Sequence, residues 1–306
     1  MDEPPHPNRS AVFDPELRPK GAHVEALPLS FDPEALDGEG GGEGGGDSFW
    51  LRLCRAVTSV AKNIGMELRM INMTIDGMAC KAAPEATVLQ VARDNGIEIP
   101  TLCHNESLGP EGRCRLCMVE VKKGTRVRLV TSCLYPVEEG LQVQTQTEKV
   151  QRVRKMVLEL LWARCPDSEV IAGMARKMGV EKFRFQPDEG NWKCILCGQC
   201  AKACEEAVGV SAIGLSMRGS IKKVGTPYAE PTGVCIGCGA CHYICPTGAI
   251  TMTEKDGVRS IWGRDFKMAA CPVCGNYFAP EYQLEWMAKT TGVSLDFLKT
   301  CQNCRK

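Results

Sequence analysis

The chain has 306 residues, with 37 Lys and Arg against 37 Asp and Glu, so its formal net charge is zero. This balance gives no electrostatic reason to expect nucleic acid as the main partner. Of the 19 cysteines, sixteen fall into four tight groups, and only Cys54, Cys80 and Cys165 stand alone. A disulfide framework does not need such clustering, so the groups indicate metal ligands.

The N-terminal region, residues 1–48, is acidic, rich in Pro and Gly, and almost without core-forming residues, which predicts a disordered extension. It begins "MDEPPHPNRS", without the basic and apolar regions of a secretory signal, and no stretch of 18 apolar residues predicts a membrane span. We therefore expect a cytoplasmic protein. Residues 49–65 carry apolar side chains at helical spacing, which predicts an amphipathic helix that packs on the next domain or on a partner subunit. Binding to a membrane surface is the alternative.

Residues 66–147 have the pattern of a small mixed α/β domain. The segment "RMINMTIDG" alternates apolar and polar residues and predicts a half-buried strand that ends in an Asp-Gly turn. In "ATVLQVARDNG", Thr87 and Gln90 match a capping box at the start of a helix. Further strands are predicted around residues 119–121, 127–129 and 141–143, giving a sheet with one helix across it.

This domain contains four cysteines in the pattern C-x10-C-x2-C-x15-C: Cys103, Cys114, Cys117 and Cys133. Plant-type [2Fe–2S] ferredoxins, which have a β-grasp fold, use a similar pattern with a shorter first gap. Structural zinc also takes four thiolates, but the sheet-and-helix pattern and the long last gap favour a [2Fe–2S] cluster. A Rieske centre needs two His ligands, and this domain has only His104.

After the first domain, "EKVQRVRKMVLELLWARC" predicts a linking helix within residues 148–190, and its apolar positions Val150, Val153, Val157, Leu160 and Leu161 share one face. Residues 191–256 then carry two C-x2-C-x2-C-x3-C runs, the signature of two-[4Fe–4S] ferredoxins, in which the fourth Cys of each run ligates the other cluster. The predicted ligands of one cluster are Cys194, Cys197, Cys200 and Cys245. Those of the other are Cys204, Cys235, Cys238 and Cys241.

The last region, residues 257–306, holds two C-x2-C knuckles: Cys271 with Cys274, and Cys301 with Cys304. Paired knuckles that close one site are typical of structural zinc, although their separation is longer than in the usual zinc ribbon. A third [4Fe–4S] cluster is the competing hypothesis, and zinc is favoured over it.

Three segments together carry a family resemblance: "PTLCHNESLGPEGRCRLCMVEV", "TSCLYPVEEGLQVQT" and "RKMVLELLWA". They resemble the N-terminal iron–sulfur region of the largest complex I peripheral-arm subunit. They are also similar to the diaphorase-type iron–sulfur subunits of NAD(P)-linked hydrogenases and formate dehydrogenases. The resemblance covers about residues 66–255. It implies a β-grasp [2Fe–2S] domain, a helical linker and a two-[4Fe–4S] ferredoxin-like domain. With the small C-terminal metal-knuckle domain that the cysteine spacing predicts, the expected fold class is α+β.

One feature of that family is missing from the sequence. Its members usually carry an H-x3-C-x2-C-x5-C site for a further [4Fe–4S] cluster after the linking helix. The corresponding segment here, "RCPDSEVIAGMARKMGV", has Cys165 alone. One thiolate cannot hold such a cluster, so we expect this one to be absent.

The cofactors implied are one [2Fe–2S] cluster, two [4Fe–4S] clusters, and one zinc or a third [4Fe–4S] cluster. No dinucleotide fingerprint, Walker loop or catalytic triad accompanies them, so no catalytic residue is predicted. These features favour a non-catalytic electron-transfer subunit of an NAD(P)H-linked oxidoreductase complex. By resemblance, its partners are a flavin-bearing NADH-binding subunit, a thioredoxin-like [2Fe–2S] subunit and a hydrogenase or formate dehydrogenase catalytic subunit.

Two other functions fit part of the pattern. A succinate dehydrogenase or fumarate reductase iron–sulfur subunit also joins a plant-type domain to a ferredoxin-like one, but the long first gap and the two complete four-cysteine runs argue against it. A non-redox zinc-binding interaction protein would leave twelve cluster-type cysteines unexplained.

Overall fold

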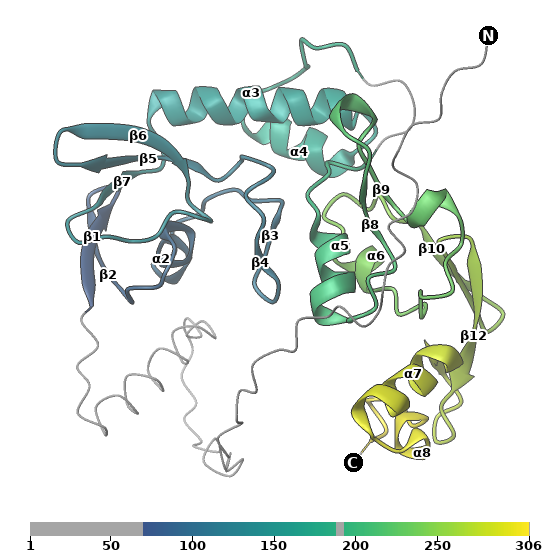
Figure 1. Cartoon of the computed structure of the whole chain (residues 1–306). Coiled ribbons are helices and arrows are strands. Elements are labelled where there is room, and N and C mark those ends of the chain that lie inside the picture. The colour runs from purple at the N-terminus through teal and green to yellow at the C-terminus, as the bar shows by residue number, and fades with distance from the viewer. Residues whose placement is uncertain (1–69, 188–192, 306) are drawn as a thin grey trace, which may run out of the picture. The chain divides into compact units, whose positions relative to one another are not determined.

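The computed structural model describes residues 70–187 and 193–305 (Figure 1). The predicted extension over residues 1–48 and the predicted amphipathic helix over residues 49–65 lie outside the described residues, as do residues 66–69 of the predicted first domain. Within the described part, no helix combines the length and the apolar character that crossing a membrane requires.

The first described region is a five-stranded mixed sheet with the strand order β2-β1-β7-β5-β6, and one helix packs on it. β1 pairs in parallel with β7, and the other neighbours are antiparallel. The elements are β1 (Ile71–Ile75), β2 (Met78–Ala82), α2 (Val88–Asp94), β5 (Met118–Lys123), β6 (Arg126–Thr131) and β7 (Gln142–Gln144). A short hairpin of β3 (His104–Asn105) and β4 (Gly109–Pro110) follows the helix.

Local sequence signals account for the first hairpin and the helix. Asp76 and Gly77 both have positive φ, the conformation of the tight turn that Asp-Gly favours between antiparallel strands. Thr87 caps α2 by accepting a hydrogen bond from the backbone N–H of Gln90 at 3.3 Å. The core between sheet and helix includes Cys117 and Cys133, so two of the predicted ligands belong to the hydrophobic interior.

Two helices follow, α3 (Glu148–Arg164) and α4 (Glu169–Lys177), capped by Thr147 and Ser168. The buried stripe of α3 is rotated from the predicted apolar face: it consists of Val150, Arg154, Leu158 and Ala163. Of the predicted positions, Val150 is buried, Val157 and Leu161 are partly buried against the core, and Leu160 is 48% exposed. The predicted face is therefore buried in part, and the apolar pattern did not predict that the guanidinium of Arg154 occupies the centre of the stripe.

The cysteine-rich region that comes next has little regular structure. It contains α5 (Gln199–Lys202), a π-helical turn (Ala203–Ala207), the hairpin of β8 (Gly214–Ser216) and β9 (Lys223–Gly225), and α6 (Ala240–Tyr243). Short 3₁₀ turns lie at Gly219–Ile221 and Pro227–Ala229. Loops of this kind leave backbone N–H groups free to bond cysteine sulfurs.

The last region is an antiparallel four-stranded sheet, β10-β11-β12-β13, followed by two helices (Figure 1). Its sheet crosses the predicted boundary at residue 256, because β10 pairs with β11 through a turn at Asp256 and Gly257. The elements are β10 (Met252–Lys255), β11 (Val258–Ile261), β12 (Arg264–Ala270), β13 (Tyr277–Pro280), α7 (Glu281–Thr291) and α8 (Leu295–Leu298).

Candidate metal centres

The first cysteine group is buried and its four sulfurs form two pairs. Cys103 Sγ accepts hydrogen bonds from the backbone N–H groups of Arg113 at 3.2 Å and Cys114 at 3.3 Å. Cys117 Sγ and Cys133 Sγ lie 3.3 Å apart. The Cys114 thiol and these backbone donors lower the pKa of Cys103 to about 6. The Cys133 thiol likewise lowers the pKa of Cys117 to about 6.

Pairing of this kind suits a binuclear centre, in which each of two irons takes two thiolates. The thiol partners within the pairs, Cys114 and Cys133, have their pKa values raised by sharing a proton with the thiolate beside them and by burial. Both thiols of each pair must lose their protons to bind a metal, so metal binding at this group releases protons.

The eight cysteines of the two C-x2-C-x2-C-x3-C runs line two cavities. One cavity is lined by Cys194, Cys197, Cys200 and Cys245 together with apolar side chains. The other is lined by Cys204, Cys235, Cys238 and Cys241. In each cavity, the first three cysteines of one run lie with the fourth cysteine of the other run. This is the grouping that the spacing predicts. That these residues ligate clusters stays a prediction.

Both cavities are unfavourable places for thiolates without a metal. Burial raises the pKa of Cys200 to about 12 and the pKa values of Cys197 and Cys241 to about 11. A metal centre supplies the positive charge that such buried thiolates need. Backbone N–H groups are already aimed at the exchanged sulfurs: Ala212 donates to Cys204 and Ala249 to Cys245, each at 3.2 Å.

Trp262 is a residue of these cavities that the sequence reasoning missed. It lies in the turn between β11 and β12, and its indole lines both cavities. Its Nε1–H donates to Cys241 Sγ at 3.4 Å. Hydrogen bonds to sulfur ligands are one of the means by which proteins set cluster potentials. No local motif marks this Trp, because its partner is 21 residues away in the chain.

Gln199 is a second missed residue, and it joins the first cysteine group to the next. It lies between Cys197 and Cys200, and its side chain is 2% exposed. Its Nε2 donates to the backbone oxygen of Cys103 at 2.9 Å and to that of Gly109 at 3.4 Å. The same interior contains Cys103, Cys114 and Cys197 packed with residues of α3 and α4.

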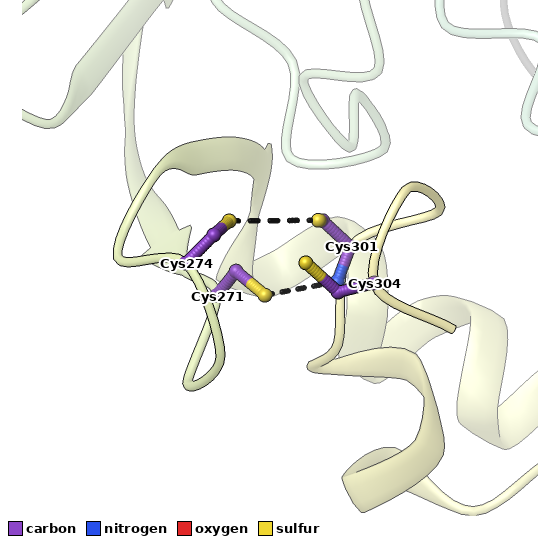
Figure 2. Close-up of side chains that lie close together, drawn as sticks. All are labelled: Cys271, Cys274, Cys301 and Cys304. Atoms are coloured by element: carbon purple, nitrogen blue, oxygen red, sulfur yellow. Dashed lines mark hydrogen bonds between the residues drawn. The ribbon is translucent and has the colours of Figure 1, made fainter. Parts of the chain in front are cut away.

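The C-terminal knuckles converge on one point, as Figure 2 shows. The sulfurs of Cys271, Cys274, Cys301 and Cys304 all lie within 4.8 Å of one another, and Cys274 Sγ is 3.7 Å from Cys301 Sγ. A Zn–S distance of about 2.3 Å places tetrahedral thiolates about 3.8 Å apart. Over residues 70–187 and 193–305, this is the one group of three or more Cys, His or carboxylate ligands close enough to share a single ion.

The electrostatics of this group also favour a metal. The backbone N–H of Cys301 donates to Cys271 Sγ at 3.4 Å and, with other backbone donors, lowers the pKa of Cys271 to about 6. Shared protons with the neighbouring thiols raise the pKa of Cys304 to about 12. Each knuckle is a tight turn: Gly275 N–H bonds Cys271 O at 2.8 Å, and Cys304 N–H bonds Cys301 O at 3.0 Å.

Two predicted isolated cysteines are within apolar cores. Cys165 follows α3 and packs with Leu158 and Ile171, and Cys80 lies in β2 inside the first core. The expectation that the family's additional four-iron cluster after the linking helix is absent stays a prediction from the sequence.

Comparisons with known proteins identify iron–sulfur binding domains in two parts of the chain. Residues 68–148 match the family model for the 2Fe-2S iron-sulfur cluster binding domain, and residues 232–251 match that for the 4Fe-4S binding domain. The chain is 31% identical over 236 residues to NADPH-Fe(3+) oxidoreductase subunit alpha of Geobacter sulfurreducens, covering 70% of this chain and 28% of that protein. It is 32% identical over 205 residues to the NADH-ubiquinone oxidoreductase 75 kDa subunit of Reclinomonas americana, covering 60% of this chain and 29% of that protein.

The chain therefore spans little more than a quarter of the length of these curated relatives. Among solved structures it resembles a chain of an NAD+-reducing [NiFe]-hydrogenase in the H2-reduced state, with a TM-score of 0.50 and 30% identity. That match covers 58% of this chain and 86% of the hydrogenase chain. With its [2Fe–2S] and [4Fe–4S] binding domains, the chain belongs to the family of iron–sulfur subunits of NAD(P)H-linked oxidoreductases, as the resemblance predicted.

Proposed function

We propose that the chain is an electron-transfer subunit of a multi-subunit NAD(P)H-linked oxidoreductase. It passes single electrons between a flavin and NAD(P) site on one partner and the active site of another. The observation that carries this proposal is a hydrogen bond between two cysteine groups. Gln199, which lies between Cys197 and Cys200 in the sequence, donates to the backbone oxygen of Cys103. Candidate redox centres that share one buried contact suit a chain of centres better than independent structural sites.

The cofactor assignment follows from how the sulfurs are grouped. The two pairs formed by Cys103, Cys114, Cys117 and Cys133 support one [2Fe–2S] cluster. The two exchanged groups that line cavities support two [4Fe–4S] clusters. Iron–sulfur clusters supply one-electron chemistry, which matches the electron-carrier role.

For the C-terminal group we propose a single zinc ion rather than a third [4Fe–4S] cluster. A four-iron cluster holds its thiolates on four different irons and so keeps them further apart than the ligands of one ion. The separations of up to 4.8 Å between the sulfurs of Cys271, Cys274, Cys301 and Cys304 suit one tetrahedral ion. This zinc then stabilises the end of the chain and takes no part in electron transfer.

The proposed partners are a flavin-bearing NADH-binding subunit, a thioredoxin-like [2Fe–2S] subunit and a hydrogenase or formate dehydrogenase catalytic subunit. The names of the relatives, which include an NADPH-linked oxidoreductase, an NADH-ubiquinone oxidoreductase and an NAD+-reducing hydrogenase, support a partner that handles NAD(P)H and a hydrogenase partner. The flavin, the thioredoxin-like subunit and the formate dehydrogenase alternative are proposed from the sequence resemblance. We place the complex in a reducing compartment, the cytoplasm, because the cysteines that the structure describes form no disulfide and are either grouped for metals or buried in apolar cores.

Metal analysis of anaerobically purified protein tests the cofactors. We expect about 10 Fe and about one Zn per chain, from one two-iron and two four-iron clusters plus one zinc. About 14 Fe without zinc would replace the zinc by a third four-iron cluster, and zinc in several sites with little iron would refute the electron-transfer proposal.

Purification of the native complex tests the partners. Recovery with a flavoprotein and a hydrogenase or formate dehydrogenase subunit, together with reduction of the clusters by NADH or NADPH in that complex, is the expected result. Recovery with a membrane-anchored quinone-reducing partner would refute the proposed partner set.

A further inference from the structure

Arg154 is a fully buried cation at the centre of α3. It is 2% exposed and has the largest side chain among the fully buried residues of the described part. Its guanidinium donates through Nε and Nη2 to the backbone oxygen of Met118, at 3.1 Å and 2.7 Å. The structure gives it no ion pair with any of residues 70–187 or 193–305 within 4.0 Å. A buried charge that is only partly neutralised is strongly unfavourable, so its presence calls for a compensating negative charge.

Burial lowers the pKa of Arg154, and Cys117 and Asp76 would oppose that shift as anions. The Asp76 carboxylate is already bonded to Thr145, accepting from its backbone N–H at 2.7 Å and its hydroxyl at 2.5 Å. Cys117, by contrast, directly precedes Met118, whose oxygen the guanidinium binds.

We propose that Arg154 is the buried counter-charge of the proposed [2Fe–2S] site and raises its reduction potential. This inference rests on the proposed function. Four thiolates make such a site anionic, and reduction adds one more negative charge. A cation fixed nearby in a medium of low dielectric constant favours the more negative, reduced state. Because Arg154 belongs to α3, the linking helix supplies a residue that sets the potential of the preceding domain.

Arg152 on the same helix offers a matched control. Its side chain is 75% exposed, and among the described residues it pairs with Glu148, one helical turn before it. Removing its charge changes the net charge of the chain as much as removing that of Arg154. Solvent screens an exposed charge, so we expect R152M to leave the potential unchanged.

The test is a redox titration of the full-length, cluster-loaded chain, followed through the electron paramagnetic resonance signal of the reduced two-iron cluster. R154M and R154Q should make reduction about tenfold less favourable, a shift of about 59 mV to lower potential for one electron. R154K keeps the charge and should stay close to the wild-type potential. R154Q keeps a hydrogen-bond donor for Met118 without the charge, so it separates charge from hydrogen bonding.

A wild-type potential in R154M or R154Q would overturn the inference and leave the proposed function standing. If R154M does not load its cluster, R154K and R154Q decide: equal potentials in these two would overturn the role of charge. Absence of any two-iron signal in the wild-type chain would overturn the proposed site itself, which is a different result.

Discussion

Replacing Gly237 by Ala tests how closely the loop that presents Cys235 and Cys238, ligands of a proposed four-iron cluster, is packed. Gly237 precedes Cys238 and has a φ of +71°, a region that costs other residues about 1–2 kcal/mol. An added Cβ would lie 2.6 Å from Cγ and 2.7 Å from Cδ2 of Phe266. Overpacking of a core costs about 1–3 kcal/mol more. The expected total is therefore about 2–5 kcal/mol.

Phe266 cannot easily give way to the new methyl group. Its side chain is 4% exposed and belongs to the same core as Cys235 and Cys241. The guanidinium of Arg264 covers its ring, with Cζ 4.7 Å from the ring centroid. The loop is also held by Arg259, whose Nη1 donates to the backbone oxygen of Gly237 at 2.9 Å. The substitution should therefore displace the loop that presents Cys235 and Cys238.

The matched control is Gly248→Ala, three residues after Cys245. Gly248 has a φ of +62°, but an added Cβ would meet nothing within 4 Å. G248A is therefore destabilised only by its backbone conformation, and G237A also by overpacking. The destabilisation of the two variants should differ by about 1–3 kcal/mol. Since about 1.4 kcal/mol is a factor of ten, a difference of about 1–3 kcal/mol predicts that iron leaves G237A about 5 to 140 times faster than G248A.

The assay is the rate of iron release to a chelator after anaerobic cluster reconstitution, with the initial iron content of each variant measured first. Equal release rates from G237A and G248A would refute the reasoning, because they would mean that the loop does not lie against Phe266 in the folded protein.

Three further predictions concern the other centres. Gln199→Leu removes the donor to the backbone oxygens of Cys103, which is buried, and Gly109, which is partly buried. Loss of the buried bond alone costs about 1–3 kcal/mol and should lower the denaturant midpoint of the chain. Gln199→Glu lacks the same donor and should show the same loss, so an unchanged midpoint in both variants would contradict the contact. Trp262→Phe removes an N–H donor to a cysteine sulfur and should lower the potential of the adjacent four-iron cluster in a redox titration, while a rise would contradict the predicted sign. Metal analysis of Cys304→Ser should show loss of the bound zinc, because one of its four ligands is removed. Gln302→Ala, at an exposed position of the same knuckle, should keep the zinc. If both variants keep it, the zinc is not bound at this site.

Most of what the sequence could predict depends on short-range covalent spacing. The Asp76-Gly77 turn and the Thr87 cap involve groups within a few residues, where backbone geometry leaves few choices. The cysteine runs are equally local, since a C-x2-C turn brings two sulfurs to one side of a loop. That the fourth cysteine of each run groups with the other run was predictable only because the spacing of the whole run is typical of two-[4Fe–4S] ferredoxins.

The stripe of α3 shows where such reasoning stops. Periodicity placed Leu160 on the apolar face and left Arg154 out of the buried stripe, because a pattern of apolar residues cannot show that a cation has a carbonyl partner in the core. Arg154 binds the oxygen of Met118, 36 residues away, and no feature of the helix sequence records that contact.

By itself the sequence determined which cysteines form groups, how many groups there are and which family the chain resembles, because ligand spacing is written along the chain. Only the tertiary structure decided which groups are neighbours and how their sulfurs are placed. Gln199 reaches the Cys103 loop across 96 residues, and the four C-terminal sulfurs close on one point from knuckles 27 residues apart. Those relations arise from the burial of side chains between distant segments, which local spacing does not encode.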